Sequence, residues 1–174
     1  KGTQKAGERF RKMANQVSRN NTRTCWVLKG DIRKFFASID QAILLDILIK
    51  RIADKSILWL LENVIQSFTT EGRHIGLPLG NLTSQLLVNI YMNEFDQFVK
   101  HDLKIKHYIR YADDRPWLEA QIQLMQIFLF GQLALQLHPT KVKIQTLASG
   151  VDFLGWVYFP HHKTLRTKTK QRMY

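Results

Sequence analysis

The stretch Tyr108-Ile-Arg-Tyr-Ala-Asp113-Asp114 predicts a short β-strand that delivers two adjacent carboxylates to a turn. Neighbouring carboxylate charges repel, and a fold that places them at the end of an apolar strand commonly offsets that repulsion with a bound cation or a basic partner. Mg²⁺ prefers carboxylate oxygens and keeps coordination positions for water and phosphate. A solvated Asp-Asp turn is the alternative, because aspartate is a frequent turn former.

The composition favours a globular domain with a polyanionic partner. The chain has 174 residues, of which 45% are hydrophobic, and it carries a formal charge of +12. Nucleic acid is favoured over an anionic membrane surface, because the basic residues are scattered along the chain and form no stripe on one amphipathic helix. The single cysteine, Cys25, suits a reducing compartment, and no apolar run approaches the length of a membrane span. We therefore expect a cytoplasmic protein without a membrane partner.

The first third of the sequence predicts a helix, a buried strand and two more helices. Residues 3–19 have helical apolar spacing and end at two asparagines, and residues 24–31 are a β-rich run that finishes on Asp31. Asp40 and Asp54 each precede an apolar helical pattern and are predicted to cap it. Trp59, in the second of these helices, is expected to be a core or partly buried packing residue.

The remainder predicts a loop, two long helices and a β-hairpin. Residues 72–80 form a glycine-rich loop, Asn81 starts a helix to about Lys100, and another helix starts at about Trp117. The first of these helices is expected to be buried on most sides, because it has two apolar stripes: Leu82, Leu86 and Ile90, and Val88, Met92, Phe95 and Val99. Residues 142–148 and 151–159 predict two strands paired as a hairpin through Ser149-Gly150.

Two of these predicted strands end on aspartates, an arrangement that indicates metal-dependent phosphoryl transfer. If the strands ending on Asp31 and Asp113 are neighbours in a sheet, their carboxylates meet at one edge, as two-metal phosphoryl transfer requires. Arg33 and Lys34 lie just beyond Asp31, where a turn can direct amides at phosphate. The loop before Asn81 can do the same at a helix N-terminus, or it can be a tight connection only.

Five segments, in this order, resemble the palm motifs of reverse transcriptases, and most closely those of bacterial non-retroviral enzymes. They are Asp31-Ile-Arg-Lys-Phe-Phe36, Gly76-Leu-Pro-Leu-Gly-Asn-Leu-Thr-Ser-Gln85, Tyr111-Ala-Asp-Asp114, Leu137-His-Pro-Thr-Lys141 and Phe153-Leu-Gly-Trp156. Within that group, residues 79–85 are similar to diversity-generating retroelement polymerases or related group II intron-like enzymes. The resemblance implies an α+β right-hand palm, with an antiparallel sheet packed on helices and part of the fingers.

The resemblance also implies a division of the chain and its partners. Residues 1–23 would be the end of the fingers, 24–159 the palm, and 160–174 the start of a connection to an absent thumb, so that the chain is a fragment of the domain. The implied reaction is Mg²⁺-dependent transfer of a nucleotide from dNTP to a primer 3′-hydroxyl. Two Mg²⁺ ions, or Mn²⁺, an RNA template and a DNA or RNA primer would take part, and an accessory protein is possible.

Each motif then implies roles for its residues. The metal-site acids would be Asp31, Asp113 and Asp114, and Lys141 would give a proton to the leaving pyrophosphate, with Lys143 as a substitute. The dNTP would be contacted by the amides of Lys34 and Phe35, by Phe36 under the sugar, and by Leu79 and Gly80 at the nascent base pair. The primer end would be held by Phe153, Leu154, Gly155 and Trp156.

The sequence departs from the family after Asp114. Members continue with an apolar strand, whereas this chain continues with Arg115-Pro116-Trp117, and proline cannot donate to a β-ladder. Without that strand, weak or no polymerase activity is expected. A non-catalytic nucleic-acid-binding remnant of a reverse transcriptase, and a palm polymerase that makes RNA, therefore stay open as alternatives.

Overall fold

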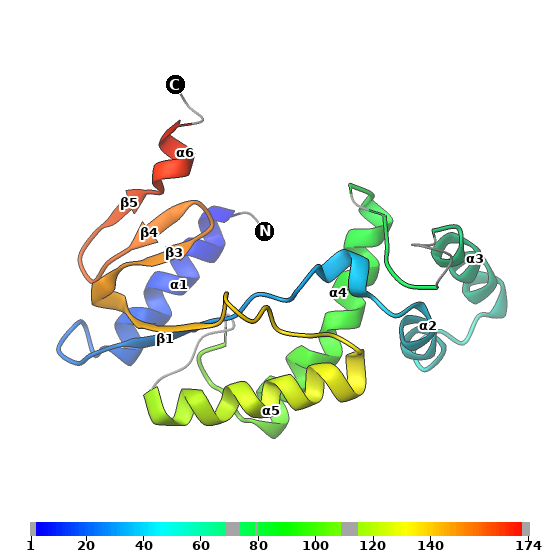
Figure 1. Cartoon of the computed structure of the whole chain (residues 1–174), viewed down its shortest axis with the longest axis horizontal. Helices are drawn as coiled ribbons and strands as arrows, with labels where there is room; N and C mark the ends of the chain where they lie inside the picture. Colours follow the sequence, from blue (N-terminus) through cyan, green and yellow to red (C-terminus); the bar gives the residue numbers. More distant parts are fainter. Residues whose placement is uncertain (1–2, 69–73, 79, 109–114, 172–174) are drawn as a thin grey trace. The chain divides into compact units, whose positions relative to one another are not determined.

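The structure, a computed structural model, describes residues 3–68, 74–78, 80–108 and 115–171 (Figure 1). The chain divides into two compact units. The first unit combines residues 1–30, 105–121 and 140–174, and the second unit combines residues 31–104 and 122–139. No helix among the described residues is long and apolar enough to cross a membrane.

The first unit consists of a helix and two small antiparallel sheets. Its elements are α1 (Thr3–Val17), β1 (Trp26–Lys29), β2 (Lys143–Thr146), the 3₁₀ turn η3 (Leu147–Ser149), β3 (Val151–Phe153), β4 (Trp156–Tyr158), β5 (Lys163–Leu165) and α6 (Thr167–Gln171). Strand β1 pairs with β2, and β3, β4 and β5 form the second sheet (Figure 1). Phe10 and Ala14 of α1 pack with Val27, Val151 and Tyr158, so that the helix and both sheets share one core.

The second unit is helical. It contains the 3₁₀ helix η1 (Phe35–Ser38), α2 (Gln41–Ile49), α3 (Lys55–Gln66), α4 (Leu82–Gln97), the π-helical turn η2 (Phe98–Asp102) and most of α5 (Arg115–Leu133), whose first turns belong to the first unit. The rings of Phe98 and Phe128 stack with centroids 4.2 Å apart, which joins η2 to α5. The buried residues Leu44, Tyr91 and Leu129 contribute to its interior.

The predicted α+β class is confirmed, and the helices lie close to their predicted bounds. The carboxylate of Asp40 accepts hydrogen bonds from the amides of Ala42 and Ile43, and Asp54 caps α3 in the same way. These caps were predictable because capping depends only on residues within one helical turn. The predicted strand 108–114 lies outside the described residues apart from Tyr108, and the division into fingers and palm stays a prediction.

The predicted hairpin through Ser149-Gly150 is wrong. Strand β2 pairs with β1, with Trp26 opposite Thr146, whereas β3 pairs with β4. The reason lies in the connection: the Thr146 hydroxyl accepts a hydrogen bond from the Ser149 amide, and Gly150 has a φ of 86°. This tight turn directs the chain out of one sheet and into the other.

Two predictions of burial are also wrong: one apolar stripe of α4 and Trp59 on α3 are largely exposed. The side chains of Leu82 and Leu86 on α4 are 82% and 61% exposed, and Trp59 on α3 is 66% exposed. The second stripe of α4 is buried as predicted, since Val88, Met92, Phe95 and Val99 are all buried. Apolar spacing identified the helices but could not tell which of two apolar faces would be covered.

Candidate functional site

Asp31 follows β1 after a single glycine and belongs to the second unit. Its carbonyl accepts a hydrogen bond of 2.7 Å from the His138 amide, and the Arg33 amide donates to the Gln136 carbonyl at 2.9 Å. Ile32, between them, forms an isolated antiparallel bridge with Leu137. The main chain around Asp31 is therefore fixed by a second segment, while the residue itself is exposed.

Lys34 to Phe36 turn the chain sharply just after Asp31. Lys34 has the left-handed backbone conformation, with φ 44° and ψ 43°, and it precedes the 3₁₀ helix η1. Phe35 and Phe36 are half-buried, with ring centroids 5.7 Å apart in an edge-on arrangement. Both residues are therefore partly accessible to solvent.

A cavity of about 330 Å³ lies beside this turn. Its polar lining comes from Arg33, Lys34, Ser38 and Gln136. Two cationic side chains, a hydroxyl and an amide at one cavity suit an anionic ligand that also accepts hydrogen bonds, such as a phosphate group.

The glycine-rich loop is tied to the same turn through the main chain. The Leu77 amide donates to the Phe36 carbonyl at 2.9 Å, and the Gly76 amide donates to the Ile39 carbonyl at 2.7 Å. Gly76 and Gly80 have φ values of 96° and 85°, in the region that glycine adopts without strain. Leu79 lies outside the described residues. The structure thus brings the loop and the Asp31–Phe36 segment together, as far as both are described.

Lys141, Lys143 and the predicted primer-end residues 153–156 lie in the first unit. Lys141 is exposed in the segment before β2, and Lys143 lies in β2 opposite Lys29. Phe153 and Trp156 are paired across a two-residue turn between β3 and β4. Their side chains are partly covered: Phe153 packs 5.5 Å from the Phe10 ring, and the Lys163 ammonium lies 4.3 Å from the Trp156 ring centroid.

The turn between these strands has an unusual leucine at its tip. Leu154 has a φ of 50° and Gly155 a φ of 85°, the pair of positive values that a type I′ turn requires. Left-handed backbone costs a non-glycine residue roughly 1–2 kcal/mol. The Leu154 side chain is also 44% exposed, so its own packing does not compensate for that cost in full.

A charged cluster braces the same turn. The Asp152 carboxylate lies 3.1 Å from Nε of Arg166, and the Arg166 amide donates to the Gly155 carbonyl at 3.0 Å. Lys29 of β1 donates to the Asp152 carbonyl at 2.8 Å. No local pattern could have predicted this cluster, because its members are far apart along the chain.

Two buried tyrosines have perturbed acidity. Burial raises the pKa of Tyr91, whose hydroxyl donates to the Leu133 carbonyl at 2.7 Å and so joins α4 to the end of α5. Burial also raises the pKa of Tyr158, although the nearby positive charge of Arg11 opposes that rise. Both side chains stay neutral at physiological pH and support structure.

The predicted metal site is described only in part. Asp113 and Asp114 lie outside the described residues, and the residues that are described contain no group of three or more His, Cys, Asp or Glu side chains placed to share an ion. The exposed Asp31 carboxylate fits the oxygen ligands that Mg²⁺ prefers. Of the three predicted ligands, the structure therefore describes Asp31 alone, and the metal site stays a prediction.

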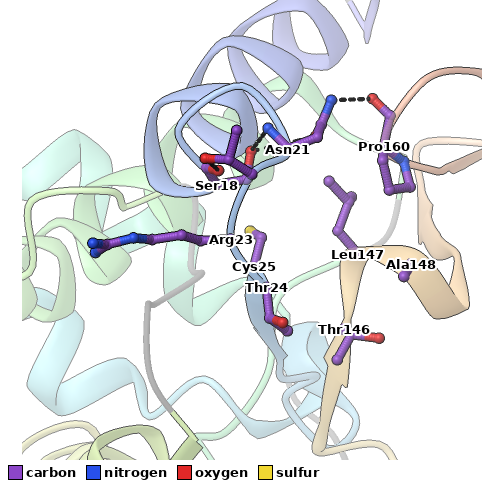
Figure 2. Close-up of a pocket in the computed structure, with 10 residues that line it drawn as sticks. Ser18, Asn21, Arg23, Thr24, Cys25, Thr146, Leu147, Ala148 and Pro160 are labelled. Atoms are coloured by element: carbon purple, nitrogen blue, oxygen red, sulfur yellow. Dashed lines mark hydrogen bonds between the residues drawn. The ribbon is translucent and has the colours of Figure 1, made fainter.

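A second cavity, of about 420 Å³, lies in the first unit between the end of α1 and the β2–β3 connection (Figure 2). Asn21 closes one side by donating to the Pro160 carbonyl at 3.1 Å, and Ser18 accepts from the Asn21 amide at 2.9 Å. Cys25 and Thr146 also line this cavity. No residue predicted to act in the reaction lines this cavity, and we assign it no catalytic role.

Sequence reasoning missed one buried polar residue in the second unit. Gln41, at the start of α2, is 1% exposed, and its side-chain amide donates to two main-chain carbonyls. A signal was present: Gln41 stands three and seven residues before the buried Leu44 and Leu48, on the apolar stripe of its helix.

Comparisons with known proteins extend over most of the chain. A family profile described as reverse transcriptase (RNA-dependent DNA polymerase) matches residues 3–158. The protein YkfC of Escherichia coli is 26% identical over 193 aligned positions, which cover 86% of this chain and 49% of that protein. The group II intron-encoded protein LtrA of Lactococcus lactis is 33% identical over 86 positions, covering 47% of this chain and 14% of LtrA. An uncharacterised 91 kDa protein in the cob intron of Schizosaccharomyces pombe is 31% identical over 81 positions, 44% of this chain and 10% of that protein. The chain thus spans half or less of the length of each of these relatives.

Proposed function

Because the chain belongs to the reverse transcriptase family, we propose that it carries out RNA-templated addition of deoxynucleotides to a primer 3′-hydroxyl. Family membership supports a polymerase-type enzyme, and the observation that carries the proposal for this chain is the cavity beside Lys34. Arg33 and Lys34 line that cavity, and they come shortly after the exposed Asp31 in the sequence. An acid and a cationic cavity in one short segment suit the metal-bound triphosphate of an incoming nucleotide.

In the proposed reaction, the primer 3′-oxygen bonds to the α-phosphorus of a dNTP, and the bond from that phosphorus to the pyrophosphate oxygen breaks. Reverse transcriptases use divalent metal ions, and Asp31, Asp113 and Asp114 would hold Mg²⁺ or Mn²⁺, which when bound supplies Lewis-acid stabilisation of phosphate charge. Lys141, or Lys143 in its place, would give a proton to the leaving pyrophosphate.

The nucleotide would be positioned by Lys34 to Phe36 and by the glycine-rich loop. The amides of Lys34 and Phe35 would contact the triphosphate, and the half-buried Phe36 ring would lie under the sugar and exclude a 2′-hydroxyl. Leu79 and Gly80 would line the nascent base pair. The hydrogen bond between Leu77 and Phe36 supports this arrangement, because it links the loop to the sugar-contacting residue.

The primer end would be held by Phe153 to Trp156. The positive φ and partial exposure of Leu154 support this role. Strained backbone persists where the surrounding structure fixes it, and such positions cluster at ligand-contacting sites. The braces from Arg166 and Lys29 to Asp152 provide that surrounding structure.

The parent element would be a bacterial retroelement. The similarity to LtrA favours a group II intron-like lineage, while residues 79–85 resemble diversity-generating retroelement polymerases. RNA template and a DNA or RNA primer would be the partners, in keeping with the charge of +12, and the protein would act in the cytoplasm.

One observation favours a second candidate, a nucleic-acid-binding protein with impaired catalysis. Helix α5 begins at Arg115, the residue immediately after Asp114. No residues are therefore left there for the strand that the family places after its paired acids. Metal sites tolerate little displacement of their ligands, so the loss of a supporting strand is expected to lower activity.

Primer extension and binding assays separate the two candidates. The chain is incubated with an RNA template, a DNA primer, dNTPs and Mg²⁺ or Mn²⁺, beside variants Asp31→Asn and Asp113→Ala. Asp46→Asn, an exposed aspartate on α2, is the matched control. Extension that is lost in the two site variants and kept in the control supports the polymerase, and tight binding without extension supports the second candidate. Failure to bind template-primer rejects both.

Phe36→Ala addresses sugar choice. If the Phe36 ring excludes the 2′-hydroxyl, the variant should incorporate ribonucleotides more readily relative to deoxynucleotides. An unchanged preference would remove Phe36 from the proposed site and would reopen the alternative of a polymerase that makes RNA.

A further inference from the structure

Gln41 connects two segments that the proposed nucleotide site requires. Its Nε2 donates to the Phe68 carbonyl at 2.6 Å and to the Gly76 carbonyl at 3.0 Å. The side chain is 1% exposed, and its Oε1 has no hydrogen-bond partner among the described residues. A primary amide can donate two hydrogen bonds, and here both go to main-chain carbonyls, one before the glycine-rich loop and one inside it.

The loop is held by a short run of main-chain bonds next to this side chain. The Gln41 amide donates to the His74 carbonyl at 3.3 Å, and Asp40 and Ile75 form an antiparallel bridge. The Gly76 and Leu77 amides then donate to Ile39 and Phe36. Gly76 therefore uses its amide toward Ile39 and its carbonyl toward Gln41, so both of its main-chain polar groups are fixed.

The Gln41 side chain satisfies a buried main-chain acceptor. Gly76 is buried, its φ of 96° lies outside the extended conformation, and its carbonyl accepts from the Gln41 side chain. A buried carbonyl without a donor is unfavourable, and the Gln41 amide supplies a donor. The amide also fixes Phe68, the last described residue before 69–73.

We infer that Gln41 is a positioning residue that holds the Gly76–Leu77 main chain against Phe36, and thereby sets the affinity of the site for the deoxynucleotide. This inference rests on the proposed function, because it concerns the same nucleotide site. Gln41 lies under the loop and makes no contact with the nucleotide in this role. Its effect passes through Gly76 and Leu77 to Phe36, whose ring would lie under the sugar.

The test compares Gln41→Met, which keeps the length of the side chain and removes its donors, with the parent chain. Hydrogen exchange of the Gly76 and Leu77 amides reports the tether, and titration with a fluorescent dATP analogue, with Ca²⁺ in place of Mg²⁺, reports nucleotide affinity. We expect exchange of both amides to accelerate about tenfold or more and the Kd for the analogue to rise by about the same factor.

Gln121→Met is the burial-matched control. Gln121 is 8% exposed, and its Oε1 also lacks a partner among the described residues, but it lies on α5 in the first unit. We expect this variant to leave both the exchange of the Gly76 and Leu77 amides and the nucleotide Kd unchanged.

Gln41→Glu adds a pH readout that a change of packing alone would not give. An ionised carboxylate only accepts hydrogen bonds and would repel both carbonyls, whereas a protonated carboxyl group can donate one. Nucleotide affinity of this variant, relative to the parent at each pH, should therefore improve as the pH falls from about 8 to about 5.

The outcomes separate this inference from the proposed function. If the parent binds the analogue and Gln41→Met binds it equally well, the positioning role is rejected. Faster exchange spread evenly over the second unit would also reject it, because that result indicates general destabilisation. If the parent binds no nucleotide, the proposed function fails and the positioning role fails with it, even if exchange at Gly76 and Leu77 accelerates.

Discussion

Replacement of Gly7 by alanine should weaken the packing of α1 against the sheet of β3, β4 and β5. Gly7 is buried in α1, and a Cβ atom built on it would overlap the hydroxyl oxygen of Tyr158 on β4. The Cζ atom of the same ring would lie at 3.4 Å, an ordinary contact. The clash is therefore confined to one oxygen atom.

The expected loss follows from two opposing contributions. Adding a methyl group to a tightly packed site typically costs about 1–3 kcal/mol. Alanine is favoured over glycine inside a helix by about 1 kcal/mol, which offsets part of that cost. We expect a net fall of about 1 kcal/mol in the unfolding free energy of Gly7→Ala.

Gly131→Ala is the matched control, since Gly131 is an exposed glycine in α5 with no atom near its added Cβ. That variant should gain about 1 kcal/mol, so the two substitutions should differ by about 2 kcal/mol. Urea unfolding followed by circular dichroism measures both, and the midpoints are compared only where the slopes agree.

A double variant isolates the clash. In a Tyr158→Phe background the overlapping oxygen is gone, and Gly7→Ala should become neutral or stabilising. Two results would refute the reasoning: equal effects of Gly7→Ala and Gly131→Ala, or a cost of Gly7→Ala that Tyr158→Phe leaves unchanged. Either would mean that α1 and β4 are not packed as closely as the structure has them.

Three further expectations follow from the site and its supports. Leu154→Asn places Asn-Gly in the type I′ turn and should raise the unfolding free energy by about 1 kcal/mol, while primer extension falls; urea unfolding and extension assays measure the two effects. Burial raises the pKa of Tyr91 above its ordinary value of 10.0, so its contribution to stability is present below pH 10 and is lost as the pH rises above it. The alkaline loss should be smaller in Tyr91→Phe than in the parent, as pH-dependent urea unfolding would show. Affinity for template-primer should fall by at least about tenfold between 50 and 200 mM salt, measured by filter binding, because the basic side chains displace counterions.

The sequence predicted the helices and the family, since both are encoded locally. Asp40 and Asp54 cap the helices that follow them, and the bonds involved join residues two or three positions apart. The five motifs are likewise short segments, and the family match to residues 3–158 agrees with their order. The order of the motifs can be read along the chain without knowing which segments are in contact in the folded protein.

The sequence by itself thus determined the helices to within a few residues, the high positive charge and the reverse transcriptase family, whereas residues 151–159, predicted as one strand, form β3 and β4. Only the tertiary structure decided that β2 pairs with β1, that Leu82 and Trp59 are exposed, and that Gln41 supports Gly76. The physical reason is distance along the chain. Caps and apolar periodicity act within a few residues, whereas strand pairing, the covered face of a helix and the partner of a buried amide depend on segments that meet only when the chain folds.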